Sequence, residues 1–315
     1  METIKVVTGA GPVGWTVATQ LAASGHRVRI LTRSGSGPEH PLVEKRCVDV
    51  GDAAQFRDAL AGADAVFHCI HGSTYSAEAW RRELPGAEQT VLDAAGEAGA
   101  VVVFPESLYS YSTPSRVMDE NSPRQAAGGK RGVRTMLLQA RAASPTRTVS
   151  VVASDFFGPR VRNAHAGERM VPRILAGKGL QLLGNPDIPH TFSYVPDLAA
   201  AMILAAKTPV AWNQVVHAPS LPAVSQRELA AAFAAAAGVR LPRVGTIPGW
   251  VVRAAGLVSR DMHELAETLY QFQEPFVMDS TASAALLGLT PTPLERAATE
   301  TVAWWRSPAS VPLPR

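Results

Sequence analysis

Three glycines near the start of the chain have the types and spacing of a phosphate-binding turn. They stand at Gly9, Gly11 and Gly14, between the β-branched run of residues 4–7 and a helix-like segment over residues 15–23. Gly9 permits a tight turn, Gly11 has no Cβ to keep the backbone away from a pyrophosphate, and Gly14 lets the helix sit close to the strand. The free N–H groups of the first turn of that helix then face the anion. Pro12 and Val13, between the second and third glycines, are further candidates for cofactor binding. The motif predicts a dinucleotide site, and the alternative is a tight glycine turn without a ligand.

A second group of candidate residues carries hydroxyl groups. Ser107, Tyr109 and Tyr111 follow the apolar run of residues 101–104. Hydroxyl groups this dense at the end of a strand are candidates for hydrogen bonding a carbonyl or hydroxyl substrate, with an ordinary polar loop as the alternative. The Asp, Glu and His residues show no metal-ligand spacing, so we expect no metal site.

The elements that must position these residues alternate between strands and helices. Apolar runs predict strands at 4–7, 27–31, 45–48, 65–69, 101–104, 148–152 and 214–217, with helices over 15–23, 53–60 and 87–98 among them. This alternation predicts an α/β protein with a Rossmann-type, doubly wound parallel sheet. Ligands bind beyond the carboxyl ends of such strands. Two of these strand ends carry further candidate residues for cofactor binding: Asp49, Val50, Cys69, Ile70 and His71. For His71, a purely structural role is as likely as a role in the site.

The end of the second strand bears on the choice of cofactor. Dinucleotide folds place an acidic side chain there to bind the ribose 2′-hydroxyl, whereas a basic side chain accommodates a 2′-phosphate. This chain has Thr32 and Arg33 at that point, and no acid. We therefore expect NADP(H), with NAD still possible. An exposed loop arginine is the alternative.

Composition excludes several classes of protein. The 315 residues are 46% hydrophobic and 18% charged, which is ordinary for a soluble enzyme and excludes a disordered chain. The net charge is +3, but Lys and Arg are scattered, so we expect no nucleic-acid partner. No apolar run approaches the length of a membrane span, and we expect a cytoplasmic protein without a membrane partner. Cys47 and Cys69 fall in strand-like runs, where we expect buried thiols.

Taken together, these motifs carry a resemblance to a known family. In order along the chain, the sequence resembles the extended and atypical short-chain dehydrogenase/reductases, the NAD-dependent epimerase/dehydratase family. The matching segments are the glycine turn, Asp49, residues 64–68, residues 107–111 followed by 119–123, residues 155–159 and residues 191–198.

The resemblance implies two domains with different functions. Residues 1–155, with 191–218 returning to them, would form the dinucleotide-binding domain. Residues 156–190 and 219–315 would form a smaller, mostly α-helical substrate-binding lobe. Ser107 would bind the reacting oxygen, and the backbone at Phe156 and Phe157 would touch the nicotinamide. A homodimer through helices 87–98 and 131–143 is also implied.

Local patterns add detail to the second half of the chain. We expect a strand at 191–194 that returns to the sheet, a following helix with Asp197 as its cap, and a short strand near 244–247. Helices are expected at 226–237, 250–257, 261–271, 281–287 and 293–305, with Ser225 and Asp261 as N-caps. Arg160, Arg162, His165 and His190 are polar groups that either line the substrate lobe or lie on an ordinary surface.

The sequence departs from the family at its catalytic Tyr-x-x-x-Lys. Residues 122–136 contain no tyrosine, and the best alignment puts Gly128 and Gly132 at the tyrosine and lysine positions. The proton would then come from Tyr109, Tyr111 or water, although Tyr111 matches a structural tyrosine of the family. The nearby Lys130, Arg131 and Arg134 could supply positive charge near the nicotinamide ribose, but a solvated basic helix start is favoured for most of them.

Three functions remain open on these grounds. The leading one is an NADP(H)-dependent reductase or dehydrogenase acting on a small carbonyl or hydroxyl compound. A nucleotide-binding sensor without catalysis is the first alternative, because the usual tyrosine and lysine are missing. A nucleotide-sugar epimerase or dehydratase is the second, and it is weaker because such enzymes normally use that tyrosine.

Overall fold

A seven-stranded parallel sheet forms the centre of the molecule. The computed structural model describes residues 3–308. Neighbouring strands pair in the order β10-β6-β5-β4-β1-β2-β3, and each of these pairs is parallel. The chain therefore has the predicted Rossmann-type sheet, and its direction of winding reverses between β1 and β4. The strands are β1 (Ile4–Thr8), β2 (Arg27–Thr32), β3 (Val43–Cys47), β4 (Ala63–His68), β5 (Val101–Ser107), β6 (Thr148–Ala153) and β10 (Gln214–His217).

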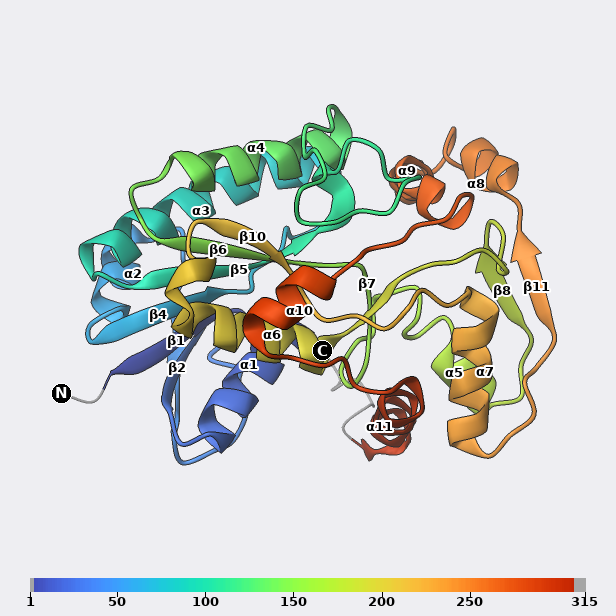
Figure 1. Ribbon diagram of the computed structural model, residues 1–315, viewed down its shortest axis with the longest axis horizontal. Helices are drawn as coiled ribbons and strands as arrows, with labels where there is room; N and C mark the ends of the chain where they lie inside the picture. Colours follow the sequence, from blue (N-terminus) through green and yellow to red (C-terminus); the bar gives the residue numbers. More distant parts are fainter. Residues whose placement is uncertain (1–2, 309–315) are drawn as a thin grey trace.

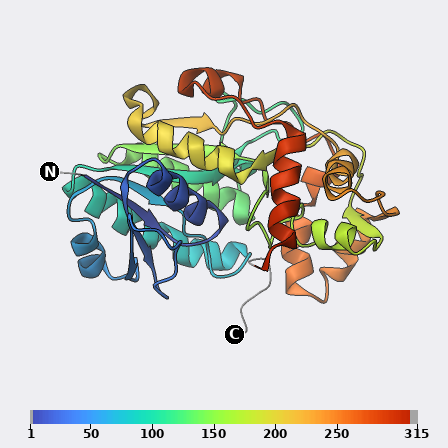
Figure 2. The same ribbon diagram turned by 90° about the horizontal axis from the view of Figure 1, so that it is seen from below.

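Helices cover both faces of this sheet (Figure 1). One layer holds α1 (Pro12–Ala23) and α6 (Val195–Lys207), which lie side by side in Figure 2. The opposite layer holds α2 (Ala53–Ala59), α3 (Ala77–Glu97) and α4 (Gly129–Ala143). Successive strand residues alternate between the layers: Val7 packs with α1 and α6, whereas Val6 packs with α2 and α3. Burial on both faces explains why the central strands are continuous apolar runs.

The rest of the chain forms a smaller lobe beyond the carboxyl ends of the strands (Figure 1). Two short parallel pairs lie there, β7 (Asp155–Phe157) with β9 (Phe192–Tyr194) and β8 (Leu180–Leu183) with β11 (Val244–Ile247). The helical elements of the lobe are α5 (Val171–Leu175), α7 (Gln226–Ala237), α8 (Gly249–Ala255), α9 (Arg260–Glu267), the 3-10 turn η3 (Leu269–Phe272) and α11 (Leu294–Arg306). Helix α10 (Thr281–Leu287) instead packs beside β10 and α6, and its Leu287 belongs to the core of the main sheet. The 3-10 turns η1 (Leu108–Ser110) and η2 (Pro209–Ala211) follow β5 and α6.

Several boundaries follow from residues recognisable in the sequence. The hydroxyl of Ser225 accepts a hydrogen bond from the amide of Glu228, whose carboxylate bonds back to Ser225, and so the predicted cap of α7 is confirmed. Gly238 ends the same helix in the left-handed conformation, with φ 66°.

Other expectations about elements were wrong for identifiable reasons. Helix α3 begins at Ala77, not near residue 87, because Ser76 caps it and the helix continues through Pro85. Strand β9 pairs with β7 and not with the main sheet. Asp197 does not cap α6; its carboxylate accepts hydrogen bonds from the amide and hydroxyl of Thr292, and it thereby ties α6 to the segment before α11. The cap of α9 is Ser259, not Asp261.

The two cysteines are free, but only one is shielded. Cys47 is exposed because β3 is an edge strand, which corrects the expectation of a buried thiol. Cys69 is half-buried, and burial raises the pKa of its thiol. No helix within residues 3–308 is long and apolar enough to span a membrane.

Candidate active site

The glycine turn lies at the carboxyl end of β1, where the sheet reverses its winding. Gly9 adopts φ 85°, and a Cβ there would lie 3.0 Å from the carbonyl oxygen of Cys69. A Cβ on Gly14 would lie 2.1 Å from the carbonyl oxygen of Gly9, so α1 can approach the turn only without a side chain. A Cβ on Gly11 would meet no atom within 4 Å. Two of the glycines thus serve packing, while Gly11 faces open space.

This open space fits a phosphate group. Gly11 is the N-cap of α1, and no side chain caps the helix. Within α1, the first amide with a partner in the chain is that of Trp15, which donates to the carbonyl of Gly11 over 2.9 Å. The amides of Val13 and Gly14, which precede it, have no intrahelical acceptor available and remain for an anion. A pyrophosphate would satisfy these donors at the positive end of the α1 dipole.

The candidates after β2 and β3 lie on neighbouring strands. Thr32 and Cys47 are opposite one another in the ladder, so Arg33 and Asp49 follow adjacent strand ends. The Arg33 side chain is exposed. The Asp49 carboxylate accepts a hydrogen bond from the amide of Gly51 over 2.9 Å, and the next residue, Val50, is buried beneath it. At this edge of the sheet the charged Arg33 side chain therefore faces solvent, next to the loop after β3 that the Asp49 carboxylate stabilises.

Two of the three candidates after β4 border the glycine turn. The Cys69 amide donates to the carbonyl of Thr8, and the Ile70 side chain lies 3.3 Å from where a Cβ on Gly9 would be. The imidazole of His71 meets Trp80 of α3 edge to face, with ring centroids 4.6 Å apart. Cys69 and Ile70 therefore border the glycine turn, whereas His71 contacts α3.

The three hydroxyl candidates after β5 have different surroundings. The Ser107 hydroxyl is half-buried and donates to the Glu106 carboxylate over 3.3 Å. The hydroxyl of Tyr109 lies 2.6 Å from that of Tyr75, which comes from the loop after β4. Tyr111 is fully buried and bonds to His217 over 2.5 Å.

The role of Tyr111 follows from the partners of His217. The other ring nitrogen of His217, Nδ1, lies 2.6 Å from the backbone carbonyl of Asp279 and must donate to it. Nε2 of the neutral ring is then the acceptor, and the Tyr111 hydroxyl donates to it. Tyr111 is thus committed to the core, which leaves Tyr109 as the tyrosine of this segment that borders the site.

The surroundings of Tyr109 raise the pKa of its hydroxyl, so this group stays protonated near neutral pH. Burial raises the pKa of Tyr109 well above its ordinary value near 10, and the neighbouring Tyr75 and Asp155 raise it further. The Tyr109 ring also stacks on Trp80, with centroids 6.2 Å apart. A phenol of this kind can donate a hydrogen bond or a proton, but it does not serve as a base near neutral pH.

A contact from the lobe lies next to Gly128, the residue that the alignment puts at the family's tyrosine, although a Cβ on Gly128 itself would meet no atom within 4 Å. Gly128 and Gly129 begin α4 with φ 72° and 46°. A Cβ on Gly129 would lie 2.0 Å from a carboxylate oxygen of Glu267 in α9. That carboxylate accepts a hydrogen bond from the Lys130 amide over 2.7 Å, so an acidic side chain caps α4 at its positive end. A glycine pair is what allows the carboxylate to approach.

The basic residues at this helix start are not solvated, which corrects the expectation for them. Lys130 is fully buried, and its ammonium lies 2.6 Å from Glu264 and 2.8 Å from Glu267. Its ammonium also lies 4.6 Å from the ring centroid of Tyr75. Arg131 donates to backbone carbonyls after β5, and Arg134 is buried over the Trp80 ring at 4.8 Å. Among these, Lys130 is therefore neutralised by α9 and has no free charge to offer a ribose.

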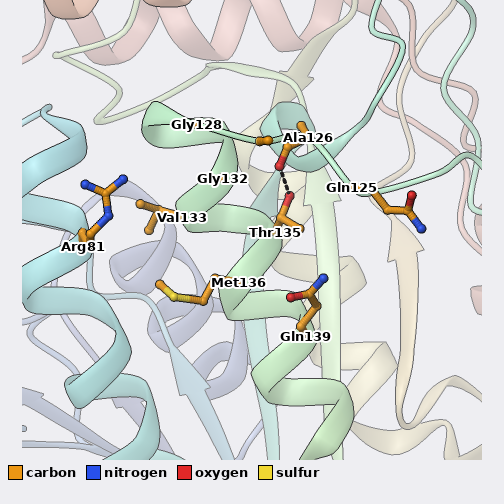
Figure 3. Close-up of a pocket in the computed structure, with 10 residues that line it drawn as sticks. Arg81, Gln125, Ala126, Gly128, Gly132, Val133, Thr135, Met136 and Gln139 are labelled. Atoms are coloured by element: carbon orange, nitrogen blue, oxygen red, sulfur yellow. Dashed lines mark hydrogen bonds between the residues drawn. The ribbon is translucent and has the colours of Figure 1, made fainter.

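Two surface hollows border this helix start. The first has a volume of about 380 Å³ and lies between α3 and α4. Figure 3 shows Arg81 of α3 beside Val133 of α4, with the hydroxyl of Thr135 donating to the carbonyl of Ala126. The second, of about 420 Å³, is lined by Gly128 and by Glu264 and Glu267 of α9, among others. Both hollows are thus next to the position of the missing tyrosine.

A pair between His190 and Asp155, which the sequence did not predict as a pair, lies beyond β6. His190 is buried, and its Nε2 lies 2.7 Å from the Asp155 carboxylate while its Nδ1 lies 3.0 Å from the carbonyl of Gln271. The ring stacks parallel to Phe272, with centroids 5.2 Å apart. The pair joins β7 to η3 of the lobe. His190 was a polar candidate of the lobe and Asp155 lies in the segment 155–159 that resembles the family, but local spacing does not predict that the two side chains meet.

The remaining candidates follow in β7. Phe157 is buried and packs on Tyr194, with ring centroids 5.3 Å apart. Phe156 is half-buried and packs against the core of the main sheet. Within residues 3–308, no group of three His, Cys, Asp or Glu side chains could hold a metal ion.

Comparison with known proteins agrees with this geometry. The sequence model of the NAD dependent epimerase/dehydratase family matches residues 5–216. A search among curated proteins found no match. Among solved structures, the enzyme WbmH of Bordetella bronchiseptica, in complex with NAD⁺, is 18% identical with a TM-score of 0.76, and the alignment covers 97% of this chain and 99% of that one.

Two epimerases have the same fold. UDP-glucose 4-epimerase of Thermotoga maritima is 16% identical, with a TM-score of 0.76 over 96% of this chain and 99% of that one. UDP-N-acetylglucosamine 4-epimerase of Bacillus cereus is 18% identical, with a TM-score of 0.76 over 98% of this chain and 99% of that one. Because the family model matches residues 5–216, which is more than half of the chain, this chain belongs to the NAD-dependent epimerase/dehydratase family.

Proposed function

We propose that the protein is an NADP(H)-dependent reductase that acts on the carbonyl group of a small molecule, with Tyr109 as the proton donor. The observation that carries this proposal is the state of Tyr109. Its hydroxyl lies at the carboxyl edge of the sheet, pairs with Tyr75 over 2.6 Å, and has a pKa raised by burial. A protonated phenol suits the reductive direction, in which the carbonyl oxygen must receive a proton.

The residues have separable tasks in this scheme. When bound, a reduced nicotinamide supplies the hydride. The glycine turn and the first turn of α1 hold the pyrophosphate, and Ser107 donates a hydrogen bond to the carbonyl oxygen. Tyr109 then gives its proton to that oxygen, and Tyr75 orients the Tyr109 hydroxyl through their hydrogen bond.

The direct test uses the purified protein, NADPH and a panel of aldehydes and ketones. We expect loss of NADPH absorbance with at least one carbonyl compound, and a stoichiometric alcohol product. Saturable NADPH binding without oxidation across a wide panel would instead support a nucleotide sensor.

Epimerisation of a nucleotide sugar is the second candidate, and the similarity to epimerase structures favours it. Such a reaction begins with removal of a proton from a sugar hydroxyl, which requires a base. Tyr109 is poorly suited to that step because its pKa is raised. Incubation with UDP-glucose and UDP-N-acetylglucosamine, followed by separation of the epimers, distinguishes the two candidates.

The choice between NADP(H) and NAD(H) depends on Arg33 in this proposal. Arg33→Ala should raise the Kd for NADPH by about tenfold, the value of one lost charge-assisted hydrogen bond, and leave the Kd for NADH unchanged. Arg27→Ala is the matched control, because Arg27 is exposed at the opposite end of the same strand. Titration calorimetry measures the Kd for NADPH and for NADH in the wild type and in both variants. A wild-type preference for NADH would contradict the role of Arg33.

A further inference from the structure

Arg160, three residues after β7, has an unusual backbone conformation. Its φ is 69°, and within residues 3–308 only one other residue besides glycines, Asn213, has a positive φ. An L-residue with a long side chain is strained in this region. Such strain persists only where the surroundings impose it, and it concentrates at functional sites. The strained backbone at Arg160 therefore indicates a functional role for its side chain.

The guanidinium of Arg160 lies over the start of α1. Its Cζ is 3.8 Å from the centroid of the Trp15 ring. Trp15 directly follows Gly14, and its amide makes the 2.9 Å bond to the carbonyl of Gly11. A guanidinium over an aromatic face is held by a cation–π contact, which leaves its N–H groups available for hydrogen bonds. The Trp15 ring therefore holds the five N–H donors of Arg160 at the start of α1.

No acceptor satisfies these donors within the described part of the chain. The side chain is half-buried, yet no hydrogen bond or ion pair joins it to residues 3–308. Burial and the neighbouring cation Arg162 lower the pKa of Arg160, whereas a carboxylate partner would raise it. A half-buried cation beside another cation is a site that favours an anion.

We propose that Arg160 binds the pyrophosphate of the dinucleotide from the side opposite the amides of α1. This inference rests on the proposed function, because it requires a bound dinucleotide. The amides of α1 and the guanidinium of Arg160 would then approach the same open space beside Gly11. Because residues 158–170 lead from β7 into the lobe, cofactor binding would also hold the first segment of the lobe against α1.

A second arginine in the chain makes the same stack without these features. Arg147 lies 4.9 Å over the ring of Trp212. It precedes β6, so it lies at the amino edge of the sheet, away from the glycine turn. It has no positive φ, and its guanidinium donates to the carbonyl of Gly99 over 3.1 Å. Arg147 is therefore a matched control for the loss of an arginine stacked on tryptophan.

The test compares Arg160→Gly and Arg160→Ala with Arg147→Ala. We expect both Arg160 variants to raise the Kd for NADPH and for NADH by the same factor, about tenfold or more, because the pyrophosphate is common to both. Their binding should also depend less steeply on salt. Arg147→Ala should bind both cofactors as the wild type does. Glycine accepts a φ of 69° without strain, so Arg160→Gly should keep or raise the Tm while it loses affinity.

Each outcome is decisive. Wild-type affinity in Arg160→Gly would overturn the proposal, and so would an equal loss of affinity in Arg147→Ala. A loss for NADPH but not for NADH would place Arg160 at the 2′-phosphate and also overturn it. If the wild type binds neither dinucleotide, the proposed function fails first; if it binds both and Arg160→Gly binds equally, only the role of Arg160 fails.

Discussion

Replacing Tyr109 with phenylalanine should lower the turnover of carbonyl reduction by about 10²- to 10⁴-fold, the usual contribution of a positioned general acid. The ring, its stacking on Trp80 and its burial are retained, so only the hydroxyl is lost. The Kd for NADPH should stay at the wild-type value, because the hydroxyl bonds to Tyr75 and not to the glycine turn. Turnover and binding are measured separately with the same carbonyl substrate.

Tyr111→Phe is the contrasting variant, two residues further along the chain. It removes a hydroxyl that donates to the buried Nε2 of His217. We expect a loss of about 1–3 kcal/mol in the free energy of unfolding, because an acceptor is left unsatisfied, with turnover of the folded protein little changed. Full activity in Tyr109→Phe together with a large loss of turnover in Tyr111→Phe would contradict this proposal, because Tyr111 would then be the proton donor and Tyr109 the structural residue.

The second large effect concerns the buried charges beneath Ser107. The Arg141 guanidinium is buried and makes two hydrogen bonds to Glu88, at 2.6 and 2.8 Å, and one to Glu106 at 2.8 Å. Glu106 in turn accepts from the Ser107 amide over 2.8 Å. Arg141→Met keeps the apolar stem but leaves the buried Glu88 carboxylate without its ion-pair partner, and leaves buried Glu106 with only Arg134, 3.5 Å away. We expect a loss of about 3–5 kcal/mol in the free energy of unfolding, measured by urea denaturation.

The pH dependence of this variant provides a check on the cause. Burial alone would raise the pKa of Glu88, but the charge of Arg141 and its hydrogen bonds outweigh burial and lower it. In the wild type, Glu88 therefore stabilises the fold above its unfolded pKa, and this stability is lost as the pH falls through the lower, folded value. In Arg141→Met burial dominates and raises the folded pKa, so the sign reverses. The deficit relative to the wild type should shrink as the pH falls from about 7 to about 5.

A surface pair is the control for this experiment. Arg57 and Glu97 form an exposed ion pair between α2 and α3. Arg57→Met should change the unfolding midpoint little at either pH, because exposed pairs gain little from charge attraction in water. An equally large loss in this variant would show that burial is not the cause of the Arg141 effect.

The sequence by itself determined the parallel sheet, the glycine turn and most helix boundaries. These depend on local chemistry: apolar runs form buried strands, glycines allow the positive φ and the close contact at Gly9 and Gly14, and Ser225 caps α7 through an amide three residues away. In each case the residues that cause the local structure lie within a few positions of one another in the sequence. For the same reason the absence of a tyrosine from residues 122–136 was evident before the fold was known.

Only the tertiary structure decided which of the candidate side chains could act. Tyr109 and Tyr111 are alike in sequence, and they differ because the η1 turn directs one to Tyr75 and the other to His217, 106 residues away. Lys130 is neutralised by Glu264, 134 residues away, in a helix whose docking no local pattern predicts. Burial, charge pairing and pKa depend on what long-range packing places beside a side chain, and the sequence around that side chain does not contain this information.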